Sequence, residues 1–190
     1  MVSRSSSRSL KRLSRRPIRA KDISMMLEEY ADMTDQATAL VLCAMVERSL
    51  ERSILSRMVR MKRKDRLDLF EGLAPIATMS AKIKIATSLG IIGPSAISDL
   101  ESIKNIRNQF AHSFHPIRFD TKSVAVECKL LQTGKKILNL PRNRAHGLGK
   151  DPRDLYAYSC WSIWLALGTK AVTGPRPKRS RDSLSRILLR

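Results

Sequence analysis

The apolar stretch over residues 37–46 constrains the fold more than any other part of the chain. It is apolar on every side of a helix, and Leu50, Ile54 and Met58 continue one stripe at four-residue steps. A helix that is hydrophobic all round is buried in the core. We therefore predict a long helix over residues 35–60 whose first half lies at the centre of the domain.

A shorter helix is predicted over residues 80–89, with Thr78 or Ser80 as its cap. Three-residue steps predict its inward face at Ile83, Ala86 and Leu89. Gly90 follows the last turn, where a residue in the left-handed conformation commonly ends a helix. The chain should therefore turn back at this glycine.

A second helix is predicted from Gly93-Pro94-Ser95, because proline is tolerated in a first helical turn. Its buried stripe follows from three- and four-residue steps at Ala96, Leu100, Ile103, Arg107 and Phe110. The polar positions Asp99, Glu101, Ser102 and Lys104 are expected elsewhere around the helix. It should run antiparallel to the helix over residues 80–89 and end at His112.

The remaining chain divides into shorter segments and loops. We predict a short amphipathic helix over residues 21–30, a basic linker over 61–66, a helical turn over 65–70 and a basic loop over 133–153. A last helix over 153–168 follows Asp151-Pro152, while Val124, Val126 and Cys128 give a signal mixed between helix and strand. The expected organisation is a disordered basic arm over 1–20, a domain over 21–172 with its core over 35–131, and a basic tail over 173–190.

Composition disfavours several kinds of protein. Cys43, Cys128 and Cys160 lack metal-type or disulfide-type spacing and are expected as reduced thiols of a cytoplasmic protein. His146 has no ligand partner at metal spacing, so we expect neither metal nor cofactor. No apolar run approaches the roughly 18 residues of a membrane span. The arm over 1–20 lacks the apolar region of a secretory signal, although its serines and arginines also resemble an organelle transit peptide.

The chain is strongly basic, with a formal net charge of +19 and a pI near 10.7. Much of the excess lies in the two tails and in the loop over 133–153. A polyanionic partner is the first expectation for such a chain. The expected nucleic-acid contacts are Arg12, Arg15, Arg16, Arg142, Arg144, Lys178 and Arg179. The alternative is that the tails only keep the protein soluble.

One compact polar group ends the second helix: Arg107-Asn108-Gln109-Phe110-Ala111-His112. Together with Ala74-Pro75-Ile76, residues 80–84 (SAKIK) and Leu89-Gly90-Ile91-Ile92, it resembles the core pattern of the mannitol operon repressor (MltR) family. The resemblance covers roughly residues 35–130. It implies an all-α domain that works as a homodimer, and it favours a helix where the signal near Val124 is mixed. The predicted fold is a compact bundle of about five to six helices with disordered basic tails.

Arg107 and His112 also fit the looser Arg-x4-6-His signature of HEPN domains, a helical superfamily that includes metal-independent ribonucleases. In such a nuclease, His112 would transfer the proton and Arg107 would hold the scissile phosphate by a two-pronged contact. Asn108 would orient one of them. The 2′-hydroxyl of the RNA would then attack without a metal ion.

A purely structural interpretation of the same residues stands beside this one. Asn108 and His112 could bond the last free carbonyls of the helix, while Arg107 pairs with Glu47 or Glu71. Glu47 borders the apolar face of the helix over 35–60 and is the better placed of the two. As an acid on that border it is otherwise expected to be solvated.

Three functions follow from these patterns. The first is an MltR-like, repressor-type transcription regulator without enzymatic turnover, acting through a partner protein or nucleic acid. No base-reading helix-turn-helix supports direct sequence recognition, because the helix that would enter the groove carries Asp99 and Glu101. The second is a HEPN-type endoribonuclease using Arg107, Asn108 and His112. The third is a non-catalytic RNA-binding accessory module whose basic tails contact phosphates.

Overall fold

The computed structural model describes residues 29–30, 32–140 and 151–173, with side chains described through residue 168. The arm over 1–20, most of the helix predicted over 21–30, residues 141–150 of the basic loop and residues 174–190 of the tail lie outside these residues. The chain divides into two units, Met1–Thr34 and Asp35–Arg190. In the first unit, Glu29 and Tyr30 are helical. The rest of the description concerns the second unit.

From Asp35 onward the described residues form seven helices and no strand, so the prediction of an all-α domain is confirmed. Their bounds are α3 (Asp35–Arg57), α4 (Arg63–Phe70), α5 (Met79–Ser88), α6 (Pro94–His112), α7 (Lys122–Cys128), α8 (Gln132–Leu138) and α10 (Pro152–Thr173). Two short helices, α4 and α8, bring the number above the expected five or six. The segment near Val124 is helical, as the family resemblance implied.

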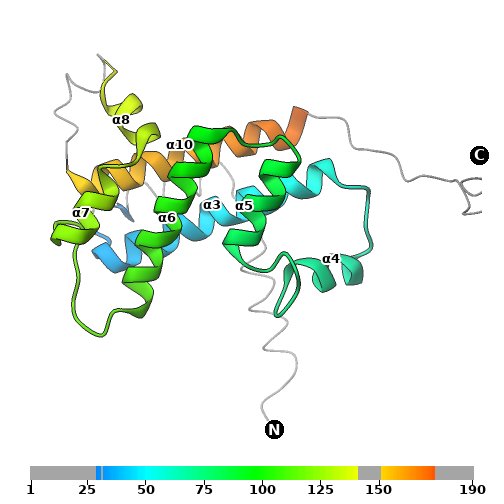
Figure 1. Ribbon diagram of the computed structural model, residues 1–190, viewed down its shortest axis with the longest axis horizontal. Helices are drawn as coiled ribbons and strands as arrows, with labels where there is room; N and C mark the ends of the chain where they lie inside the picture. The colour runs from blue at the N-terminus through cyan, green and yellow to red at the C-terminus, as the bar shows by residue number, and fades with distance from the viewer. Residues whose placement is uncertain (1–28, 31, 141–150, 174–190) are drawn as a thin grey trace, which may run out of the picture. The chain divides into compact units, whose positions relative to one another are not determined.

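Helix α3 lies at the centre, as its apolar sequence predicts. It packs against α10, α6 and α5, and Figure 1 shows α3 and α10 running side by side with the green helices across them. Ala39, Val46, Leu50 and Ile54 are fully buried along its length. The helix ends three residues earlier than predicted. Val41 and Ala44 are exposed, so its first half is covered on most sides rather than all round.

The two ends of α5 confirm the predicted cap at Thr78 and the predicted turn at Gly90. Thr78 accepts a hydrogen bond from the Ala81 N–H at 3.2 Å and so caps α5. Gly90 has a φ of +64°, and the amides of Gly90 and Ile91 bond back to the carbonyls of Thr87 and Ala86, both at 2.9 Å. This is a Schellman motif, in which the two residues after the C-cap satisfy carbonyls of the last turn.

The predicted inward face of the short helix is wrong at its last position. Leu89 is 41% exposed, whereas Ile91 and Ile92 are buried. The cause is the same turn, because the chain reverses at Gly90 and folds the two isoleucines under the helix. Leu165 on α10 is likewise exposed, at 55%. Ile163 and Leu167 are buried on that helix instead.

Two polar residues of α6 expected toward solvent are buried, Asp99 and Ser102. The Asp99 carboxylate accepts hydrogen bonds from the backbone amides of Gln132 at 2.9 Å and Thr133 at 2.8 Å. These amides lie at the start of α8, where the first helical N–H groups have no partner within the helix. A buried carboxylate on one helix therefore caps another.

The loop predicted over residues 133–153 begins instead with α8, whose Gly134 is buried against α10. The amide of Gly134 donates to Ser159 Oγ at 2.9 Å. A Cβ at this position would lie 2.4 Å from the Leu155 carbonyl oxygen and 2.5 Å from Ser159 Oγ. Only glycine lets the two helices approach this closely. The sequence alone predicts Gly134 to lie in a loop.

Aromatic rings fill the centre between α6, α7 and α10. The ring centroids of Phe110 and Phe119 are 4.9 Å apart, and those of Phe119 and Tyr156 are 5.2 Å apart. The Tyr156 hydroxyl donates to the Ala39 carbonyl of α3 at 2.8 Å. Because Phe110 is part of this group and lies between Arg107 and His112 in the chain, the aromatic contacts hold in place the end of α6 that carries both residues. In the described ranges, we find no helix with the length and apolarity that a bilayer crossing requires.

Candidate functional site

Arg107 lies on the α6 face that meets α3, where the helical spacing places it. Its side chain is 29% exposed, and its Nη2 lies 4.0 Å from Glu47 Oε2. Glu47 Oε1 also accepts a hydrogen bond from Lys82 Nζ of α5 at 2.9 Å, and Lys82 lies 3.4 Å from Glu51 Oε2. We call these four residues, Glu47, Glu51, Lys82 and Arg107, the charge cluster.

The charge cluster confirms the expected pairing of Arg107 with Glu47. The expectation that Glu47 is a solvated acid is wrong, because its side chain is 22% exposed and contacts two cations. The sequence analysis did not predict that Lys82 belongs to this site; its side chain is buried, with only 5% of the residue exposed. One signal was available: Glu47 and Glu51 are four residues apart on one helix face, where two acids favour a cation between them.

Cys43 lies beside Arg107, at the edge of the charge cluster. Its thiol donates to the Met79 sulfur at 3.5 Å. Burial raises the pKa of the Cys43 thiol above its ordinary 9.0, and the hydrogen bond and charge of Arg107 oppose that rise without cancelling it. A thiol that keeps its proton at neutral pH is a poor nucleophile. Cys43 therefore contributes packing rather than chemistry to this region.

His112 and Asn108 occupy a different side of α6 from Arg107. His112 is exposed and Asn108 is half-buried. Residues four apart share a helix face, whereas residues five apart are turned by about 140°. Arg107 therefore faces α3 while His112 faces solvent. Within the described part of the chain, no hydrogen bond or ion pair joins His112 to Arg107 or Asn108.

The last carbonyl groups of α6 accept hydrogen bonds from other residues than the sequence predicts. The Phe110 carbonyl accepts a hydrogen bond from Gln36 Nε2 of α3 at 3.2 Å, and the Gln109 carbonyl accepts one from the Ser113 amide at 3.0 Å. Among these described contacts, neither Asn108 nor His112 bonds a terminal carbonyl. That part of the structural interpretation lacks support here, and the side chain of His112 remains accessible beside the fully exposed Phe114.

No group of three potential metal ligands occurs among the described residues. His146 lies outside them, as do the expected nucleic-acid contacts Arg12, Arg15, Arg16, Arg142, Arg144, Lys178 and Arg179. The described site therefore consists of one accessible imidazole, one half-buried amide and an arginine engaged by an acid of its own domain. An imidazole can transfer protons, but the described residues of one chain do not place a phosphate-binding arginine next to it.

Comparison with known proteins gives no match. Neither a protein-family model, nor a curated protein, nor a solved structure is similar to this chain at a significant level.

Proposed function

We propose that this protein is a non-enzymatic, repressor-type regulator of the MltR kind, which acts as a homodimer through a partner protein or nucleic acid. The observation that carries the proposal is the engagement of Arg107 by Glu47. A phosphate-binding arginine in a nuclease needs its donors free for the substrate, because the transition state gains charge that those donors must stabilise. In this domain the guanidinium faces α3 and lies 4.0 Å from the Glu47 carboxylate, whose negative charge repels a phosphate at the same place.

The test asks whether the protein cleaves RNA. The purified chain is incubated in EDTA with a mixed RNA pool, and the length and ends of the recovered RNA are measured. We expect full-length RNA from the wild type and from the His112→Ala and Arg107→Ala variants alike, each checked for helical content. RNA with 2′,3′-cyclic phosphate ends, lost in both variants, would overturn the proposal.

A HEPN-type endoribonuclease is the second candidate, and the exposure of His112 favours it. The imidazole is accessible at the end of α6, with the Asn108 amide on the same face. If Arg107 serves such a reaction, Glu47 restrains it, so a Glu47→Gln variant should cleave RNA faster than the wild type. If Arg107 is structural, Glu47→Gln should lower only the free energy of unfolding. Cleavage kinetics and urea unfolding of this one variant therefore separate the two functions.

A further inference from the structure

Exposed cations gather where α3 ends and α4 begins. Arg57 is the last residue of α3, Arg60 and Lys62 lie in the connection, and Arg63 and Lys64 begin α4. All five side chains are exposed. We call these five residues the basic corner. Figure 1 shows α4 set off from the other helices below the end of α3, and the residues of its first turn, 63–65, are exposed. From the sequence, residues 61–66 were predicted only to form a basic linker.

The basic corner gathers five cations that have no described acidic partner, a property that cations elsewhere in the domain, such as Lys84 and Lys122, have as well. Five other cations lie within 4.0 Å of a carboxylate: Lys82, Lys104, Arg107, Arg118 and Arg153. In the described residues, none of the basic-corner side chains forms an ion pair. Asp65 and Asp68 are the acids of α4, and both are exposed. Unpaired charges a few residues apart lie within about one Debye length, roughly 8 Å, so their potentials add.

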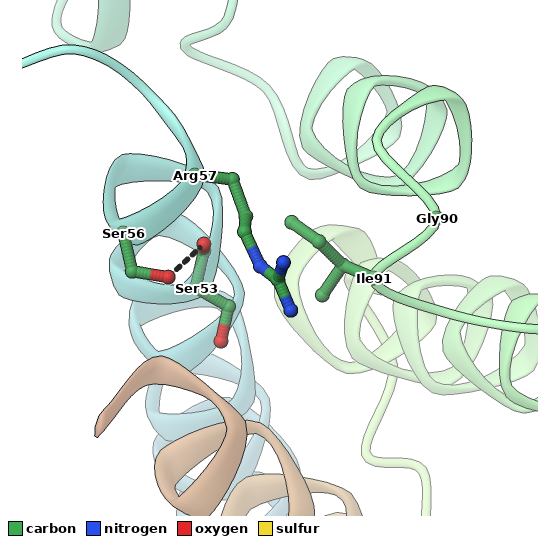
Figure 2. A pocket seen from close by; sticks show the side chains of 5 residues that line it. All are labelled: Ser53, Ser56, Arg57, Gly90 and Ile91. Atoms are coloured by element: carbon green, nitrogen blue, oxygen red, sulfur yellow. Dashed lines mark hydrogen bonds between the residues drawn. The ribbon is translucent and has the colours of Figure 1, made fainter. Parts of the chain in front are cut away.

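Arg57 extends this charge over a small cavity. The cavity measures about 130 Å³ and is lined by Ser53, Ser56, Arg57, Gly90 and Ile91. Figure 2 shows the guanidinium reaching from α3 toward Gly90 and Ile91. The two serine hydroxyls already donate elsewhere, Ser53 to the Leu167 carbonyl at 2.9 Å and Ser56 to the Ser53 carbonyl at 2.7 Å. Arg57 is therefore the side chain whose donors remain for a ligand in this cavity.

The surroundings favour a nucleic acid over a membrane surface. A helix that binds a membrane surface needs a broad apolar face opposite its charges. On α4 the apolar side chains turn inward, because Phe70 is 3% exposed and Leu67 and Leu69 are half-buried. Leu73 is the one fully exposed large apolar side chain near α4 among the described residues. A row of cations without an apolar face matches a backbone of successive phosphates.

We propose that the basic corner binds the phosphate backbone of nucleic acid, with the Arg57 guanidinium as its anchoring contact. This inference rests on the proposed function, because it names the macromolecule and the surface through which the regulator acts. An arginine can grip a phosphate with two parallel hydrogen bonds, whereas the lysines act as point charges. Such binding positions the protein without reading bases.

The test uses the full chain and two variants with the same loss of charge. The corner variant is Arg57→Gln, Lys62→Gln, Arg63→Gln and Lys64→Gln. The control variant is Lys84→Gln, Lys122→Gln, Lys129→Gln and Lys136→Gln, four exposed lysines that lie on other helices or, for Lys129, directly after one. Fluorescence anisotropy measures affinity for a labelled single-stranded RNA and a DNA duplex over a salt series, after circular dichroism confirms that both variants fold. The same three proteins are tested on phosphatidylserine vesicles.

We expect the corner variant to lose at least ten-fold in affinity at low salt and the control less than three-fold. On RNA the slope of log affinity against log salt should fall by roughly 0.7 for each lost phosphate contact, and the control slope should change by less than that. Arg57→Gln alone should remove about one contact, whereas Arg52→Gln, exposed on the same helix outside the cavity, should remove none.

Equal losses in the two variants, absence of nucleic-acid binding by the wild type, or a loss confined to vesicle binding would each overturn the inference. Its failure is distinguishable from failure of the proposed function. RNA recovered from every binding reaction is checked for length, and cleavage would refute the non-enzymatic regulator whether or not the basic corner binds.

Discussion

Lys82 is a buried cation whose charge is compensated by two acidic partners. It is nearly fully buried and lies between Glu47 and Glu51. Removing one member of a buried ion pair leaves the other charge uncompensated. We expect Lys82→Met to lower the free energy of unfolding by about 1–3 kcal/mol at pH 7, a moderate loss because the two acids are partly exposed.

Urea unfolding monitored by circular dichroism measures this loss. The matched control is Lys84→Met, two residues away on the same helix and exposed, which should change stability by at most about 0.5 kcal/mol. Equal effects of the two substitutions would mean that the charge cluster contributes nothing specific to stability.

Gly134 sets the distance between α8 and α10. Because an added Cβ would lie 2.4 Å from a backbone oxygen, the helices must move apart to admit it. We expect Gly134→Ala to lower the free energy of unfolding by about 2–3 kcal/mol, in the range of overpacked sites. Gly168→Ala on α10 is the control, since its Cβ meets nothing within 4 Å. That alanine should be neutral or stabilising, by up to about 1 kcal/mol. Thermal unfolding compares the two, and a Gly134→Ala protein as stable as the control contradicts the close approach.

At the scale of single residues, the sequence predicts apolar positions better than polar ones. The inward positions Leu100, Ile103 and Phe110 are buried as their spacing indicates. Lys82 and Asp99 are buried as well, although charged side chains are seldom fully buried unless paired. Their partners lie 35 and 33 residues away in the chain. Periodicity within one helix does not identify such partners: it predicts the Arg107–Glu47 pair and, from Glu47 and Glu51, the need for a cation, but not that Lys82 supplies it.

At the scale of elements, Gly90 decides where α5 ends and α6 can begin. Its φ of +64° is a conformation that costs other residues about 1–2 kcal/mol. We expect Gly90→Ala to lower the free energy of unfolding by that amount, while Gly93→Ala, at a φ of −100°, costs about 0.5 kcal/mol because alanine is a poorer N-cap than glycine. Chemical unfolding of both variants checks the difference. Equal stability of the two proteins would show that the Schellman turn tolerates a side chain.

The long helices could be predicted and the short ones only in part. Helices α3, α6 and α10 each repeat an apolar pattern over several turns, and α5 and α6 have glycine or proline at their ends. Helix α8 has neither property, because its N-cap residue Leu131 has no side chain that can cap it and the helix contains Gly134. Its first amides are satisfied by Asp99 and Ser159 from other helices. A helix whose capping groups come from other helices has no capping signal in its own sequence, so its sequence predicts a loop.

At the scale of the whole domain, buried thiols make stability depend on alkaline pH. Burial raises the pKa of Cys128 from 9.0 to about 12, and it raises that of Cys160 well above 9.0. Between these values the unfolded chain loses the thiol proton while the folded chain keeps it. The unfolded state then binds fewer protons, so stability falls as pH rises from 9 toward 12, by up to about 1.4 kcal/mol per pH unit for each thiol.

Urea unfolding under reducing conditions near pH 8 and pH 10.5 measures this dependence for the wild type and for Cys128→Ala. The alanine variant should lose less stability between the two pH values, by up to about 2 kcal/mol, because the other ionisable groups are common to both proteins. Cys43→Ala should reduce the pH dependence less, since Arg107 opposes the rise in the Cys43 pKa. Identical pH profiles for the wild type and Cys128→Ala would mean that the Cys128 thiol is hydrated in the folded domain, and its place in the core between α7 and α10 would have to be revised.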